Sequence, residues 1–229
     1  MKNLKQYITE KLKITKDNIG YKHEYFPKTK KELQELLKQL IEERGLEGDF
    51  NDIDTSNITD MSWLFYESKF NGDISNWDVS NVKNMQFMFK SCISFNQTLN
   101  DWNVSNVTDM RYMFSNCHEF NGDISNWDVS NVTNMNGMFS NSIFKGDISN
   151  WDVSNVTDMH EMFRESIFNK DISKWNISNV TDMKYMFKKS IFNKDISNWK
   201  LNNNCNTFMM FDDCTLEDQP EKWPKNYKK

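Results

Sequence analysis

Hydrophobic positions recur along this chain with a spacing of 24 or 25 residues. Each copy reads approximately W-D-V-S-N-V-T-D-M-x-x-M-F-x-x-[S/C]-x-F-N-G-D-I-S-N, and the copies begin at Trp77, Trp102, Trp127, Trp151, Trp175 and Trp199. An earlier copy begins at Ile53, which takes the place of the tryptophan. Self-similarity at such a period is typical of a solenoid, in which each unit buries its apolar face against its neighbours. Because near-identical copies rarely build a catalytic centre, the repeat favours a binding surface over an enzyme.

Within one copy the hydrophobic period changes. Residues 74–79 follow the L-x-x-L-x-L spacing of a leucine-rich-repeat strand, and Trp77 and Val79 alternate with polar neighbours. The next apolar residues fall at helical spacing, at Val82, Met85, Met88 and Phe89. We therefore expect an α/β fold, an LRR-like solenoid of about seven strand–helix repeats with a parallel sheet.

The two ends of the array depart from the repeat. Thr29 and Glu32 form a Thr-x-x-Glu capping box, and Gly45 is a typical stop signal, so the intervening residues are predicted to form a helix. Its apolar face consists of Leu33, Leu36, Leu37, Leu40 and Ile41. This helix should cap the first layer of the solenoid. At the other end we expect Trp223 and Pro224 to fold over the last layer.

Four segments follow from these boundaries. They are a basic N-terminal segment (1–26), the capping helix (27–50), the solenoid (51–216) and a C-terminal tail (217–229). The first segment carries a short apolar stripe among lysines, formed by Leu4, Tyr7, Ile8 and Leu12. It is interpreted either as a helix packed beside the cap or as a detachable docking peptide; a membrane-surface helix is the weakest of the three readings.

The repeat resembles the BspA-like leucine-rich-repeat family, which is found in bacterial surface proteins, mycoplasma lipoproteins and some viral or mobile-element proteins. The resemblance rests on W-D-V-S-N-V-T-D-M-x-x-M-F and F-N-x-D-I-S, and it extends over residues 51–214. It implies an LRR-like solenoid with a non-enzymatic binding role, often adhesion to host matrix or cell surfaces. The family has no catalytic residues to carry over.

Charge is distributed unevenly along the chain. Residues 1–46 hold 11 Lys/Arg and 7 Asp/Glu (net +4), which leaves 17 against 26 (net −9) for the remainder. The acidic body offers no basic face for nucleic acid. No apolar run near the start is long enough for a signal peptide or a membrane span. We therefore expect a protein that is cytoplasmic as synthesised and has no membrane partner, with surface or virion display as the alternative.

Two columns of acidic and amide side chains run along the array. One lies on the polar side of the predicted strands, at Asp54, Asp78, Asn103, Asp128, Asp152 and Asn176. It is interpreted as a structural ladder in which Asn relieves the repulsion between stacked carboxylates, with a calcium site as the alternative. The second column should bond turn amides, at Asp73, Asp123, Asp147, Asp171 and Asp195. The three histidines lack zinc-ligand spacing, so no metal and no cofactor are expected.

Three of the four cysteines occupy one position of the repeat. Cys92, Cys117 and Cys214 each lie fifteen residues after the tryptophan of their copy, where the other copies carry Ser. A position that accepts Ser or Cys needs a small side chain in close packing, which predicts reduced, buried thiols. A disulfide between Cys92 and Cys117 is the alternative.

The most variable positions lie between the two methionines of the predicted helix. Aromatic and basic residues that the core does not require are typical binding anchors. The candidate partner-binding residues on this helix side are Trp63, Phe87, Arg111, Tyr112 and Tyr185. Relaxed constraint on a solvent-facing side is the competing explanation of the variation.

These observations predict a non-enzymatic protein-binding module with an unspecified protein partner. The alternatives are a surface or virion adhesin that recognises host protein or glycan, and a structural spacer. The chain is expected to be monomeric, with self-association through the solenoid ends as the alternative.

Overall fold

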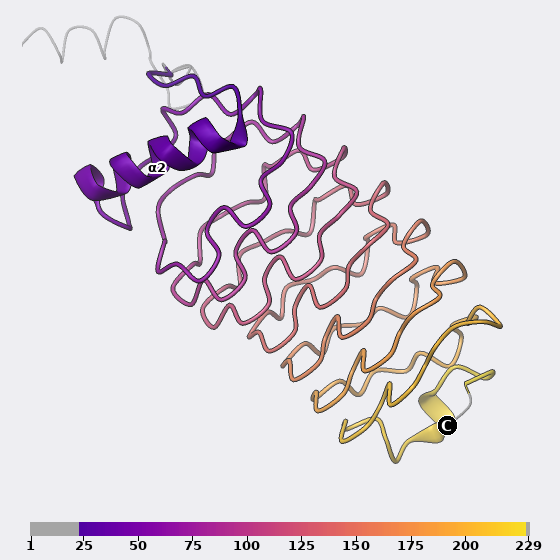
Figure 1. The fold of residues 1–229 in the computed structure, drawn as a ribbon. Coiled ribbons are helices and arrows are strands. Elements are labelled where there is room, and N and C mark those ends of the chain that lie inside the picture. Colours follow the sequence, from indigo (N-terminus) through magenta and orange to yellow (C-terminus); the bar gives the residue numbers. More distant parts are fainter. Residues whose placement is uncertain (1–22, 228–229) are drawn as a thin grey trace, which may run out of the picture.

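A computed structural model describes residues 23–227 and shows an elongated stack of coils, one for each sequence repeat (Figure 1). Helix α2 (Lys30–Arg44) lies across the N-terminal end of the stack. A short 3-10 helix, η2 (Pro220–Lys222), lies at the C-terminal end. The long axis of the molecule therefore follows the order of the repeats along the chain.

The predicted strand–helix repeats and their parallel sheet are wrong. Among residues 23–227, α2 is the only α-helix and no strand forms. Successive coils are joined by isolated parallel bridges, beginning with Asp60↔Asn84 and Asn84↔Asp109 and continuing to Asp182↔Asn206. The coils are built mainly from turns, and the segments expected to be helices contain tight turns instead.

Backbone hydrogen bonding explains why these segments are not helical. In the first coil the N–H groups of Met61, Trp63 and Phe65 donate to carbonyls of the next coil, at 2.9–3.0 Å. Of the two N–H groups between them, that of Leu64 donates to the Met61 carbonyl three residues back, and that of Ser62 donates to the Asp60 carboxylate at 2.8 Å. In a helix every such N–H would bond within its own segment. Here an identical neighbouring coil supplies acceptors for every second residue, so the chain forms consecutive turns.

These consecutive turns require left-handed backbone. Trp63 has φ 62° and Glu67 has φ 54°, and equivalent residues repeat this geometry in the later coils. The turn 61–64 has positive φ at its third residue and not at its second, which is the φ pattern of a type II turn. Met88 and Phe89 lie three and four residues after Met85, and all three are buried as they would be on a helix.

A glycine substitution tests this left-handed geometry. Lys189 is exposed and has φ 57°, a backbone conformation that is strained for residues other than glycine. We expect Lys189→Gly to raise the free energy of unfolding by about 0.5–1 kcal/mol. Asn141→Gly, at the equivalent position with φ 51°, should raise the free energy of unfolding by less, because Asn tolerates the left-handed region better than Lys. Urea denaturation checks both; destabilisation by Lys189→Gly would contradict the assigned backbone.

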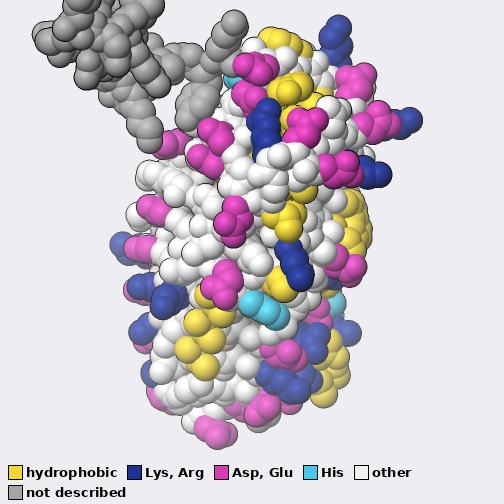
Figure 2. Space-filling view, turned by 90° about the vertical axis from the view of Figure 1, so that its left-hand side faces the viewer, with side chains coloured by type: hydrophobic (Ala, Val, Ile, Leu, Met, Phe, Trp, Pro, Cys, Tyr) yellow, Lys and Arg dark blue, Asp and Glu magenta, His cyan; other side chains and the backbone are white. Residues whose placement is uncertain are grey.

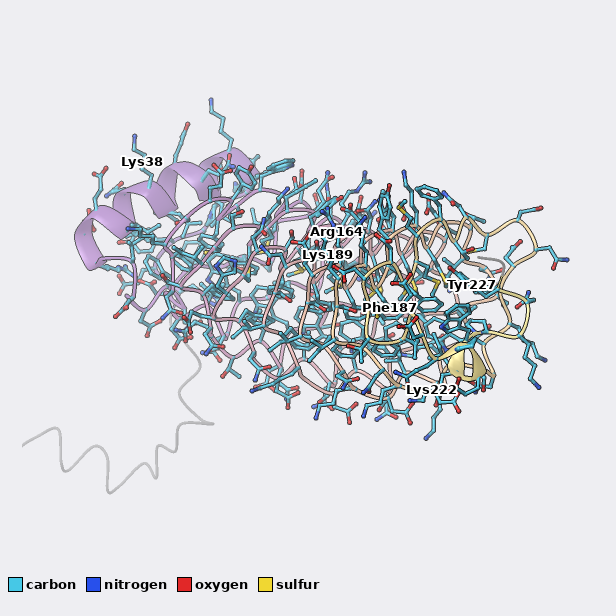
Figure 3. The ribbon with its side chains drawn as sticks, turned by 90° about the horizontal axis from the view of Figure 1, so that it is seen from below. Lys38, Arg164, Phe187, Lys189, Lys222 and Tyr227 are labelled. Atoms are coloured by element: carbon cyan, nitrogen blue, oxygen red, sulfur yellow. The ribbon has the colours of Figure 1, made fainter. Side chains whose placement is uncertain are left out.

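Stacked aromatic rings fill the interior of the coils. The phenylalanine after the second methionine packs on its equivalents above and below, for example Phe139 on Phe114 and on Phe163, each at 5.9 Å between ring centroids. Phe187 lies in the same interior column (Figure 3). The six tryptophans that begin the copies are also buried, and the indole N–H of each donates to a carbonyl of the preceding coil, as from Trp127 to Leu99 at 2.9 Å. The buried side chains thus form one continuous core.

Both ends of the core are covered as predicted. The Thr29 hydroxyl accepts from the Glu32 N–H at 3.2 Å, and Gly45 ends α2 with φ 79°. Leu33, Leu37 and Leu40 of α2 belong to the core. At the C-terminal end, Trp223 stacks on Phe211 at 5.5 Å, and Pro224 is buried. The apolar stripe at residues 4–12 lies outside the described residues.

Candidate interaction surface

Aspartate or asparagine residues at three positions of the repeat cap turns in most coils. In each case one side-chain oxygen accepts from the N–H two residues on, as in Ser80 to Asp78 at 2.9 Å and Ser125 to Asp123 at 2.9 Å. The third set precedes each Met-x-x-Met segment, for example His160 to Asp158 at 2.9 Å. These contacts confirm that the second acidic column bonds turn amides, and they show that the first column does the same. Among residues 23–227 no three His, Cys, Asp or Glu side chains form a group that could hold a metal ion.

This capping predicts acid sensitivity. The pKa values of Asp123, Asp147, Asp171 and Asp195 lie below the ordinary 3.8, mainly because a serine N–H stabilises the ionised carboxylate. A folded-state pKa below the unfolded value gives stability that is present above pH 3.8 and is lost as the pH falls through the folded-state pKa. Changing all four to Asn should therefore reduce the loss of unfolding free energy between pH 5 and about 2.5. Equal losses in variant and wild type would contradict this.

The thiols of Cys92, Cys117 and Cys214 are buried and free, as predicted, and Cys205 is half-buried. Cys117 donates to the carbonyl of Phe89 at 2.9 Å, and Cys92 donates to that of Phe70 at 3.3 Å. Burial raises the pKa of the Cys92 thiol to about 12 and also raises that of Cys117. These cysteines therefore act as small packing groups and do not form a reactive site.

Three candidate anchor residues stack into one unit, which we call the aromatic ladder: Trp63, Phe87 and Tyr112. The ring centroids of Trp63 and Phe87 are 4.0 Å apart, and those of Phe87 and Tyr112 are 5.2 Å apart, with interplanar angles of 16° and 15°. All three residues have positive φ and stand at the same position of consecutive coils. Trp63 is 43% exposed, whereas the other two are half-buried by their neighbours.

Gly137 ends the aromatic ladder. A side chain at this position would meet the Tyr112 ring at 2.2 Å, so the ring lies directly against the glycine backbone. The Tyr112 hydroxyl reaches across the coil of Gly137 to the coil after it, where it donates to Glu161 at 3.1 Å. Burial, reinforced by this carboxylate, raises the pKa of Tyr112 to about 12. The tyrosine therefore remains neutral and bridges two coils.

Tyr185 and Arg111 share this side of the molecule but do not join the ladder. Tyr185 lies two coils beyond Gly137 and packs edge-on against Phe208 at 5.8 Å. Arg111 forms an ion pair with Asp109 in its own coil. The structure thus brings three of the five predicted anchor residues into contact and separates the other two from them.

Lysines beside the rings were not identified from the sequence. The Lys90 ammonium lies 4.8 Å from the Tyr112 centroid and 5.3 Å from that of Phe87. Lys184 and Lys188 lie over the Tyr185 ring in the same way, at 4.7 and 5.1 Å. Such contacts combine apolar area with positive charge. The contact of Lys90 with Tyr112 depends on the stacking of the coils, whereas those with Phe87 and Tyr185 join residues one or three apart in sequence.

Other exposed apolar side chains are few and scattered. Figure 2 shows one long side of the stack, where uncharged polar groups dominate and hydrophobic side chains gather in small separate patches. On other positions of the repeat, Ile93, Ile167 and Ile191 are 41–49% exposed. These residues share one place in the repeat, directly after the Ser/Cys position, and this was the signal in the sequence that could have indicated them.

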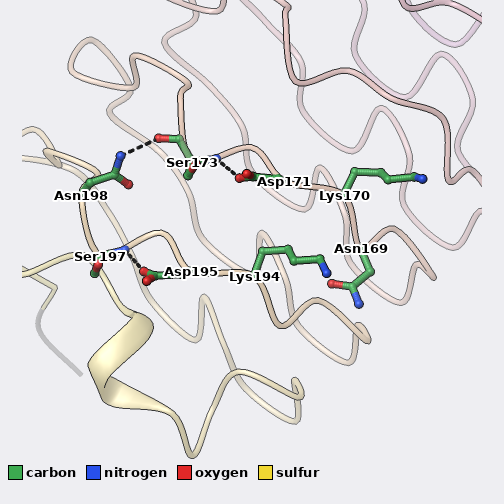
Figure 4. Close-up of a pocket in the computed structure, with 8 residues that line it drawn as sticks. All are labelled: Asn169, Lys170, Asp171, Ser173, Lys194, Asp195, Ser197 and Asn198. Atoms are coloured by element: carbon green, nitrogen blue, oxygen red, sulfur yellow. Dashed lines mark hydrogen bonds between the residues drawn. The ribbon is translucent and has the colours of Figure 1, made fainter.

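A polar hollow of about 660 Å³ lies between two late coils (Figure 4). Its polar groups largely satisfy one another. Asp171 accepts from the Ser173 N–H and Asp195 from the Ser197 N–H, both at 2.9 Å, and the Asn198 amide donates to the Ser173 carbonyl. The hollow therefore follows from the regular turn capping, and nothing in it converges on a ligand.

Comparison with known proteins identifies the family. A family model described as "Mycoplasma protein of unknown function, DUF285" matches the chain twice, at residues 32–143 and 123–223. The chain belongs to this DUF285 repeat family. The two matches overlap and together run from α2 to the C-terminal cap, so they cover all the coils. No curated protein and no solved structure matches the chain. The residues that the structure describes contain no helix long and apolar enough to cross a membrane.

Proposed function

We propose that this DUF285 protein is a non-enzymatic protein-binding module whose contact surface includes the aromatic ladder. The ladder is the observation that carries the proposal. Trp63, Phe87 and Tyr112 place large, rigid side chains next to one another outside the core, which is the composition of binding hot spots. The resemblance of the repeat to the BspA-like family, in which repeats of this type bind other molecules, supports the same role.

Ring stacking favours a protein partner over a glycan or a nucleic acid. Bases stack on free aromatic faces, and a sugar ring packed on an aromatic would likewise need one. In the ladder the faces of Phe87 are occupied by Trp63 and Tyr112, and one face of Tyr112 lies against Gly137. The edges of the Phe87 and Tyr112 rings remain available for contact, and apolar side chains of a protein can pack against ring edges. Lys90 beside the rings provides a positively charged neighbour for an acidic residue of the partner.

The carboxylates support a non-enzymatic role. The capping aspartates each use an oxygen to accept from a backbone N–H, and they repeat along the stack without converging on one another. General acid–base catalysis needs titratable groups that converge on a shared pocket. A regular scaffold that presents side chains from successive coils meets the requirement of binding and not that of catalysis.

Paired substitutions test the proposed surface. A partner is captured with the wild-type chain and its Kd is measured by calorimetry. Phe87→Ala combined with Tyr112→Ala should weaken this binding by at least about 2 kcal/mol. The control is Asp128→Asn combined with Asp152→Asn, which keeps an acceptor for the Ser130 and Ser154 amides and should leave binding nearly unchanged.

Thermal melting of both variants separates loss of contact from loss of fold. The idea is refuted if the partner tolerates the aromatic pair but is lost with the aspartate pair, because the capped turns would then be the recognition surface.

A further inference from the structure

The open C-terminal end of the stack carries backbone donors that every earlier coil satisfies. In the coil before it, the N–H groups of Met183, Tyr185, Phe187 and Lys189 donate to carbonyls of the last coil, at 2.8, 3.1, 3.0 and 2.9 Å. The same four bonds join each earlier pair of coils. They are the main-chain links that hold successive turn segments in register.

In the last coil the equivalent donors have no following coil. Within the described part of the chain, the N–H groups of Thr207, Met209 and Phe211 make no hydrogen bond. The fourth, that of Asp213, is taken by the Glu217 carboxylate at 2.8 Å. We call the three free donors the open edge. A row of unpaired N–H groups at alternate residues is a template for an added extended segment.

The open edge borders an apolar hollow of about 470 Å³. Its walls include Phe208 and Met209, which are 54% and 42% exposed. Trp223 and Tyr227, whose rings are 5.0 Å apart, form the opposite wall. The hollow is of the size that holds one large side chain or a small ligand.

Acidic side chains line this hollow, and two lysines lie beside Phe208 and Met209: the Lys184 ammonium is 5.7 Å from the Phe208 ring and that of Lys188 is 3.9 Å from the Met209 sulfur. Asp212 and Glu217 line it, and residues 207–221 contain five Asp/Glu and no Lys or Arg. Asp212 already attracts a cation, because it pairs with Lys188 at 2.7 Å. A segment that carries basic side chains beside apolar ones would therefore match both the charge and the surface of the hollow.

We propose that the open edge binds an extended, basic segment of a partner protein. The segment would place carbonyls at alternate residues opposite Thr207, Met209 and Phe211, and an apolar side chain in the hollow. The proposal rests on the binding role proposed above but assigns a second surface, at the end of the stack. A second copy stacked coil on coil is disfavoured, because at the matching side of the first coil the Lys30 ammonium of α2 lies 2.5 Å from the Ser62 hydroxyl and 3.4 Å from the Asp60 carboxylate.

Two peptides taken from the repeat itself serve as probes. The peptide of residues 181–192 carries three Lys and one Asp (net +2), and that of residues 157–168 carries one Arg and three Asp/Glu (net −2). Both keep the Met-x-x-Met-Phe pattern and have the same length. With the full chain, we expect the basic peptide to bind at least ~10-fold more tightly than the acidic one, as measured by fluorescence anisotropy.

Amide hydrogen exchange locates the bound peptide. Saturation with the basic peptide should slow exchange of the Met209 and Phe211 amides at least ~10-fold, because each gains a carbonyl acceptor. Asp212→Lys combined with Glu217→Lys should weaken the binding of the basic peptide at least ~10-fold. Glu221→Lys, an exposed change outside the hollow, should have little effect. Melting curves confirm that each variant remains folded.

Three results would overturn the proposal. The first is equal affinity for the two peptides, or no binding of either. The second is protection elsewhere, for instance only near the aromatic ladder. The third is protection of the same amides in the absence of peptide, if that protection increases with protein concentration. This result would show that a second copy of the chain occupies the open edge. These measurements concern the end of the stack, whereas the Phe87 and Tyr112 substitutions concern the aromatic ladder. Either proposal can therefore fail without the other.

Discussion

Phe139→Ala should lower the free energy of unfolding by about 3–5 kcal/mol. Phe139 is fully buried and its ring packs against Phe114, Phe144 and Phe163, so both neighbouring coils contact it. Regular hydrogen bonding on both sides limits how far the coils can close on the space left behind, and the cavity cost adds to the lost burial. Chemical denaturation measures the change.

An exposed phenylalanine provides the control for this substitution. Phe208 is 54% exposed, so Phe208→Ala should cost less than about 1 kcal/mol. If Phe139→Ala also cost less than about 1 kcal/mol, the interior column of rings would not be the core that supports the stack.

Leu40→Asp should cost at least about 3 kcal/mol or prevent soluble expression. Leu40 is fully buried where α2 covers the first coil, so the new carboxylate would be desolvated among apolar side chains. Loss of this contact would also expose the apolar edge of the first layer, which an open stack must keep covered.

Gln39→Asp, one residue earlier on the exposed side of α2, is the matched control and should change stability by less than about 0.5 kcal/mol. Thermal melting and size-exclusion chromatography follow both variants. A soluble Leu40→Asp monomer with wild-type melting would show that α2 does not protect the end of the stack.

The candidate surface was predicted only in part. Trp63, Phe87 and Tyr112 are at least partly exposed, whereas Ser62 and Gly137, which also lie at variable positions, are buried. The contact of the three rings with one another was not predicted. The three rings touch because equivalent residues of successive coils lie above one another. The nearly equal length of the copies indicates this register. The break in the ladder depends on Gly137 and on the reach of Tyr112 to Glu161, a contact between residues 49 apart in sequence. No local pattern could have indicated that contact, whereas the lysines three residues after Phe87 and Tyr185 form a local pattern that could have been noticed.

The sequence by itself determined the repeat, the buried residues, the capping helix and the buried thiols. These depend on local composition and on periodicity, since apolar residues at fixed positions must be inside whatever backbone carries them. Only the tertiary structure decided between helix and turn. Spacing of three and four residues places Met85, Met88 and Phe89 inside in either case. The choice depends on where each N–H finds its acceptor, and here every second acceptor belongs to the next coil, about 24 residues away in sequence.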